Sequence, residues 1–105
     1  MNKKLIGYIS VDAGLCWIGD PCYILHQEKL PKSLGKDWGE FCDKLAGKER
    51  SWEFDHDSGI DGLGVCVSSG HGDGYYPVYA EIDERGVINK VSFQQFSRIH
   101  LLKVG

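Results

Sequence analysis

Short apolar runs, several of which alternate with polar residues, recur along this chain, and this pattern is typical of β-strands joined by turns. Residues 5–11 have apolar side chains on both faces, which predicts a well-covered strand. Residues 15–18 are expected to return as a second strand in a hairpin, because Asp12-Ala13-Gly14 has the composition of a tight turn. Further strands are predicted in the second half of the chain, at residues 51–56, 63–67, 75–82, 87–96 and 99–104.

One segment, residues 37–46, has the periodicity of an amphipathic helix. Its apolar residues recur at spacings of three and four, on one helical face: Trp38, Phe41, Cys42 and Leu45. Asp37 would lie at the positive end of the helix dipole, and Gly47 is a natural C-terminal stop. We expect the aromatic stripe to pack into the core.

Together these elements predict an α+β fold, with a predominantly antiparallel β-sheet of about six or seven strands and one amphipathic helix packed on it. The 105 residues are expected to form a single domain, residues 1–105. Pro77 interrupts the strand predicted at residues 75–82, which indicates an edge position or a bulge. An exposed edge there would leave room for a homo-oligomer.

The net charge and the length of the apolar runs limit the classes of partner that the protein is expected to bind. The net charge is −3 and the basic residues are scattered, which argues against nonspecific nucleic-acid binding, although it leaves open a local basic patch in three dimensions. No apolar run approaches the roughly 20 residues that span a bilayer, so no membrane partner is expected. Tyr8, Ser10 and Asp12 interrupt the first apolar run, so we expect a cytoplasmic protein without a signal peptide.

The chain has four cysteines, Cys16, Cys22, Cys42 and Cys66. Their spacing lacks the paired CxxC of a structural zinc site, and no export signal favours disulfides. We expect free and mostly buried thiols, with metal ligation and disulfide pairing as the alternatives.

The run SSGHGDGYYPVY, residues 68–79, is the best candidate for a site. Its glycines, Gly70, Gly72 and Gly74, alternate with His71 and Asp73. A binding loop would use its backbone N–H groups and these two side chains as contacts. Alternatively, the glycines satisfy the geometry of a hairpin connection whose polar side chains are solvated. The run is neither a P-loop nor a Rossmann turn, because no Gly-Lys-Ser/Thr follows it and the next element is a strand.

A second candidate segment is GDPCY, residues 19–23. Pro21 restricts Asp20 to extended angles, or begins a short helical turn for which Asp20 is the N-cap.

Convergence of the two segments would permit two kinds of chemistry. Four side chains could then hold a divalent cation or orient a water molecule: Asp12, Asp20, Asp73 and His71. Cys22 with His71 could form a thiol–imidazole pair. Each aspartate also has an adequate explanation as a turn or cap residue.

The two segments belong to longer stretches, VDAGLCWIGDPCY at residues 11–23 and GHGDGYYPVYAEIDERGVI at residues 70–88. This pair resembles a family of small bacterial and bacteriophage proteins in which a VDxGxxxIGDPCY segment precedes a GDGxYPVY segment. The resemblance covers about a third of the chain directly. It implies a soluble protein of bacterial or phage origin with a β-rich fold, and it transfers no activity and no catalytic residue.

The leading hypothesis is a small soluble binding or interaction module whose partner is a compact polar molecule, such as a nucleotide, or a host protein. A phage-borne or prophage-borne copy would act by sequestration or inhibition. No cofactor and no catalytic residue is predicted. The predicted ligand-binding residues come from both segments: Asp20, Cys22, Tyr23, Gly70, His71, Gly72, Asp73, Gly74 and Tyr75.

Two alternatives come from other classes of protein. The first is a small metal-assisted hydrolase that uses Asp20, His71 and Asp73. The second is a structural or assembly protein that has no small-molecule site.

Overall fold

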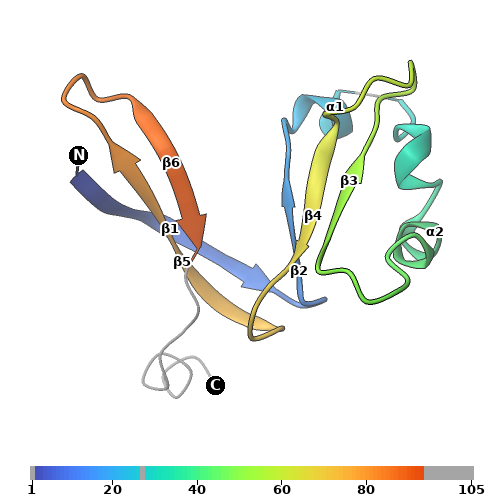
Figure 1. Ribbon diagram of the computed structural model, residues 1–105, viewed down its shortest axis with the longest axis horizontal. Coiled ribbons are helices and arrows are strands. Elements are labelled where there is room, and N and C mark those ends of the chain that lie inside the picture. The colour runs from blue at the N-terminus through green and yellow to red at the C-terminus, as the bar shows by residue number, and fades with distance from the viewer. Residues whose placement is uncertain (1, 27, 94–105) are drawn as a thin grey trace. The chain divides into compact units, whose positions relative to one another are not determined.

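The computed structural model describes residues 2–26 and 28–93. This part contains six strands and three short helices, in the order β1 (Asn2–Val11), β2 (Leu15–Ile18), α1 (Cys22–Leu25), the 3-10 helix η1 (Lys32–Leu34), α2 (Trp38–Asp43), β3 (Ser51–Phe54), β4 (Gly64–Ser68), β5 (Gly74–Ile82) and β6 (Ile88–Phe93). Within the described residues, the chain divides into two compact units, residues 2–15 with 69–93 and residues 16–68. Each unit holds one three-stranded antiparallel sheet (Figure 1).

The sheet of the first unit has the strand order β1-β5-β6 (Figure 1). β5 is antiparallel to both of its neighbours, and a bulge between Leu5 and Gly7 shifts the register of β1. Alternate residues of β5 point to one face, as the sequence predicts, and Tyr76 and Ala80 on that face are fully buried. The ring of Tyr76 packs edge-on against Phe93 of β6, with 5.7 Å between ring centroids.

The sheet of the second unit has the strand order β2-β4-β3, and helix α2 lies beside β3 (Figure 1). Phe54 joins the helix to the sheet. Its ring centroid lies 5.3 Å from that of Phe41 in α2 and 5.7 Å from that of Trp17 in β2. Leu63 and Cys66 are also buried in this core, so a row of aromatic rings and small apolar groups holds the second unit together.

Helix α2 confirms the helical pattern but is shorter and more exposed than the sequence predicts. Asp37 is its N-cap, where the carboxylate accepts the Glu40 N–H at 2.9 Å. The last turn tightens to 3-10 geometry, because the Leu45 N–H donates to the Cys42 carbonyl. No residue of α2 is buried, and Trp38 is 60% exposed. Within the predicted stripe, Phe41 and Leu45 are half-buried, and Phe41 stacks on the buried Phe54.

The predicted hairpin between residues 5–11 and 15–18 is wrong. Both segments are strands, but β1 pairs with β5 and β2 pairs with β4, so they belong to different sheets. Residues 12–14 have the composition of a turn, but they connect two strands that belong to different sheets. The expectation of one sheet is also wrong. Which strands pair depends on contacts between segments that are distant in the sequence, and the local pattern does not record these contacts.

Pro77 does not lie on an edge strand, because β5 is the central strand of its sheet. It stands opposite Tyr8 of β1, and the described pairing with β6 begins one residue later, at Val78. In the described chain the missing N–H of Pro77 therefore interrupts no bond to β6. The end of the strand predicted at residues 87–96, and the one at 99–104, lie outside the described residues.

Among the described residues, no helix has the length and apolar character needed to cross a membrane.

Gly64, the first residue of β4, is required by the packing of Trp17. A Cβ built at Gly64 would overlap the indole, with its Cη2 atom 2.7 Å and its Cε2 atom 2.8 Å away. Backbone and ring can approach this closely only because glycine has no side chain.

We predict that Gly64→Ala lowers the free energy of unfolding by about 1–3 kcal/mol, because the added methyl group displaces Trp17. Chemical denaturation measures the change. The matched control is Gly7→Ala, also in a strand, where a Cβ would have no neighbour within 4 Å. An equal loss of stability in the two variants would contradict this account of Gly64.

Candidate functional site

The glycine loop, residues 69–73, connects β4 to β5 and lies against the turn at residues 12–14. Ser69 is buried, and its N–H donates to the Gly14 carbonyl at 2.9 Å. Gly72 has a φ of 79°, which favours glycine, and its Cα lies 3.6 Å from where a Cβ of Gly14 would stand. A Cβ at that distance would make an ordinary contact, so the positive φ of Gly14 and Gly72, and not a lack of space, favours glycine in the two turns.

The buried hydroxyl of Tyr76 holds the glycine loop in place. It accepts the His71 N–H at 3.1 Å and donates to the Gly72 carbonyl at 2.9 Å. The Ser69 hydroxyl donates to the same carbonyl at 2.8 Å, and the Gly72 N–H donates back to the Ser69 carbonyl at 3.1 Å. These bonds tie the loop to the sheet and make it a closed turn.

The closed turn leaves few backbone donors for a ligand. The N–H groups of Ser69, His71 and Gly72 already have acceptors inside the fold. Within the described part of the chain, those of Gly70 and Asp73 have none. The side chains of His71 and Asp73 are exposed. The loop therefore presents an imidazole, a carboxylate and two N–H groups on a rigid connection.

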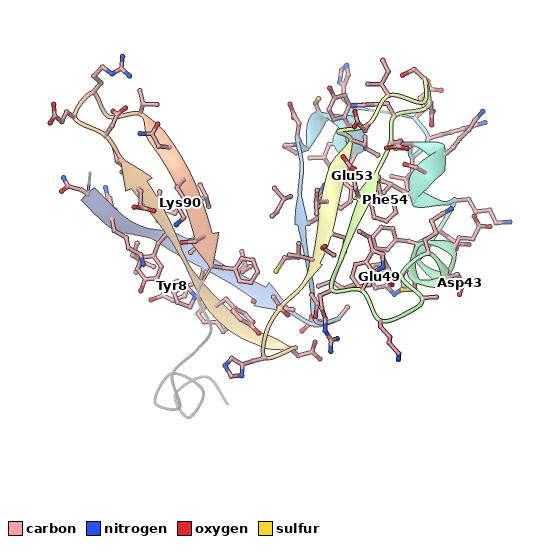
Figure 2. All side chains as sticks on the ribbon, viewed as in Figure 1. Tyr8, Asp43, Glu49, Glu53, Phe54 and Lys90 are labelled. Atoms are coloured by element: carbon pink, nitrogen blue, oxygen red, sulfur yellow. The ribbon has the colours of Figure 1, made fainter. Side chains whose placement is uncertain are left out.

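An exposed pair of tyrosines lies beside the glycine loop. Tyr75 is 40% exposed and Tyr8 is 52% exposed, yet their rings stack with centroids 4.8 Å apart and planes 8° from parallel. Tyr8 projects from β1 (Figure 2), and Tyr75 stands opposite Ser10, so the two rings are diagonal neighbours on one face of the sheet. The sequence predicted Tyr75 as a contact but missed Tyr8, which only the strand register brings to it.

The second predicted segment forms the short helical turn α1. Its N-cap residue is Pro21, and the Asp20 carboxylate accepts the N–H of Cys22 at 3.0 Å. The predicted turn is therefore confirmed, with the cap one residue later than Asp20. Tyr23 packs edge-on against His56, with ring centroids 4.7 Å apart. His56 lies in the loop after β3, so this contact joins two segments that are far apart in the sequence.

The thiol of Cys22 lacks the lowered pKa of an activated nucleophile. Its hydrogen bond to the Asp20 carboxylate raises the pKa of Cys22, with further contributions from desolvation and from the Asp20 charge. In return, hydrogen bonds from the backbone and the thiol of Cys22 lower the pKa of Asp20. A catalytic cysteine needs a lowered pKa, so this arrangement does not favour the thiol–imidazole hypothesis.

All four cysteines are free, but the expectation that most are buried is wrong. Cys66 is buried and Cys16 half-buried, and burial raises the pKa of both thiols. Cys22 and Cys42 are exposed, because the short helices that carry them lie at the surface of the second unit.

The predicted site residues divide between the two units. Asp20, Cys22 and Tyr23 belong to the second unit, whereas the glycine loop, Tyr75 and Asp12 belong to the first. No three His, Cys, Asp or Glu side chains among the described residues are grouped to hold a metal ion.

We predict that Tyr76→Phe lowers the free energy of unfolding by about 1–2 kcal/mol, because the His71 N–H loses its acceptor next to a buried ring. Tyr75→Phe is the matched control and should change stability by less than about 0.5 kcal/mol, since Tyr75 is exposed. Chemical denaturation of the two variants compares them. Equal effects would show that the Tyr76 hydroxyl does not hold the loop.

We predict that Asp20→Asn increases the rate at which iodoacetamide alkylates Cys22 at neutral pH. The substitution removes the carboxylate whose hydrogen bond and charge raise the pKa of Cys22, so the thiolate fraction rises. Peptide mass spectrometry follows each cysteine separately. Cys42, which is also exposed, is the internal control and should keep its rate. A Cys22 rate that stays the same or falls would rule out control by Asp20.

No curated protein and no solved structure matches this chain significantly. The family model described as a protein of unknown function, DUF4241, matches residues 3–93. This match spans both candidate segments, both sheets and most of the chain. The chain therefore belongs to the DUF4241 family.

Proposed function

We propose that this chain is a small binding module that takes a nucleotide at the glycine loop and the tyrosine pair beside it. The observation that carries the proposal is the exposed, parallel stack of Tyr8 and Tyr75 next to a loop whose His71 and Asp73 side chains are also exposed.

The tyrosine pair suits a planar ring. Stacking of a nucleobase on an aromatic side chain contributes about 1–3 kcal/mol and requires no particular base. Because Tyr8 and Tyr75 already stack on each other, little side-chain freedom is lost when a third ring is added. The pair therefore supplies apolar area at a small entropic cost.

The loop suits the polar part of a nucleotide. The free N–H groups of Gly70 and Asp73 and the imidazole of His71 are donors for phosphate or sugar oxygens. The Asp73 carboxylate accepts hydrogen bonds from a ribose hydroxyl or a base amino group. The hydrogen bonds of Tyr76 hold the loop before a ligand arrives, which lowers the cost of ordering it.

The proposal assigns no reaction to the chain. A phage-encoded copy would act by withdrawing its ligand from the host. Contacts from Asp20, Cys22 and Tyr23 remain a prediction from the sequence, and the proposal does not depend on them.

We predict that a panel of ribonucleoside monophosphates shifts the amide resonances of residues 70–75 and of Tyr8 in a saturable way. Tyr75→Ala should weaken binding about tenfold, because it removes one stacking ring. Asp73→Ala should weaken it by a similar factor. Heteronuclear NMR titration measures both effects, and ³¹P spectra of the same samples report any hydrolysis.

The matched control is Glu84→Ala, which removes an exposed carboxylate from the turn between β5 and β6. It should leave the affinity unchanged. If no member of the panel shifts these resonances, the nucleotide proposal is wrong. Consumption of a nucleotide that stops in Asp73→Ala would replace binding by the hydrolase alternative.

A further inference from the structure

A hollow of about 540 Å³ lies in the second unit, between the segment that follows α1 and the start of α2. Its volume is within the range of small-molecule sites. Most of its lining residues are charged, and the lining includes Glu28, Lys29, Leu30, Lys32, Lys36 and Glu40. This hollow is separate from the residues of the proposed nucleotide site, which all belong to the first unit.

Hydrogen bonds and buried residues anchor one wall of the hollow. The Lys32 N–H donates to the Asp57 carboxylate at 2.7 Å, and the Ser33 hydroxyl donates to the Asp55 carbonyl at 2.6 Å. Leu34, which follows Ser33 in the chain and precedes helix α2, is buried. The backbone that carries Lys32 and Lys36 is therefore held in place before any ligand binds.

The charges on the wall are unevenly paired. Lys36 is neutralised by Glu40, which accepts its backbone N–H at 3.0 Å and faces its ammonium group at 3.5 Å. Gly35 permits this contact, because a Cβ there would lie 2.7 Å from the Glu40 Cβ. In the described chain, no carboxylate lies within ion-pair distance of Lys29 or Lys32. Two ammonium groups on the wall thus lack a counter-charge.

We infer that this hollow binds a compact organic phosphate. A phosphate monoester carries about two negative charges near neutral pH, which matches the two unpaired ammonium groups of Lys29 and Lys32. The protein as a whole has a net charge of −3. The local excess of lysine over glutamate around the hollow therefore has the opposite sign to the net charge of the protein.

The remaining wall describes the organic part of the ligand. The hollow is larger than an inorganic phosphate needs, and Leu30, which is 41% exposed, offers an apolar contact. Glu28 has no ion-pair partner among the described residues, and its carboxylate accepts hydrogen bonds from hydroxyl groups and repels a second anionic group. A phosphorylated sugar has this combination of one phosphate and several hydroxyl donors.

The test is an NMR titration of the full chain with glucose 6-phosphate, at constant ionic strength. We expect saturable shifts at residues 28–36, and weaker binding of inorganic phosphate and of glucose. The double variant Lys29→Gln/Lys32→Gln should weaken binding of glucose 6-phosphate by about tenfold or more, because it removes two charge-assisted contacts.

The matched control is Lys44→Gln/Lys48→Gln, which removes two exposed lysines of the same unit from outside the hollow. It should keep the full affinity. Absence of saturable shifts at residues 28–36, or an equal loss in the control, would overturn the inference. Shifts confined to residues 70–75 would also overturn it, because they would place the ligand on the glycine loop in the other unit.

Discussion

The candidate site of the first unit depends on one buried hydroxyl group. Tyr76 is fully buried, so its hydroxyl must find partners inside the protein, and it finds them in the backbone of His71 and Gly72. This requirement draws the glycine loop onto the sheet and forces Gly72 into positive φ. The backbone of His71 and Gly72 bonds to Tyr76, while the side chains of His71 and Asp73 remain exposed.

Aromatic packing has the corresponding role in the second unit. Phe54, the last residue of β3 (Figure 2), packs against Phe41 and Trp17. The ring of Trp17 lies on the backbone of Gly64, which has no side chain. This core holds α2 against the sheet, and hydrogen bonds to residues 55 and 57 hold the segment of Lys32 beside it. The hollow and its lysines follow from that anchoring.

The two proposed surfaces differ in the physical basis of recognition. The tyrosine pair with the glycine loop offers flat apolar area and a few fixed polar groups, which suits an aromatic ring with a polar substituent. The lysine-lined hollow offers two ammonium groups that have no ion-pair partner among the described residues, beside the apolar contact of Leu30. The cysteines contribute to neither surface, and the protonated Cys22 thiol held by Asp20 has the opposite character to that of a catalytic nucleophile.

The sequence by itself determined where the strands and turns lie, because alternation, glycine and proline act over a few neighbouring residues. The bounds of β2 and the position of Asp37 at the start of α2 are examples. Only the tertiary structure decided that β1 pairs with β5 rather than β2, since every strand offers the same backbone donors and acceptors. The same long-range pairing stacks Tyr8 on Tyr75, and hydrogen bonds to residues 55 and 57 anchor the segment of Lys32. Such contacts depend on register and packing between distant segments, which no local pattern records.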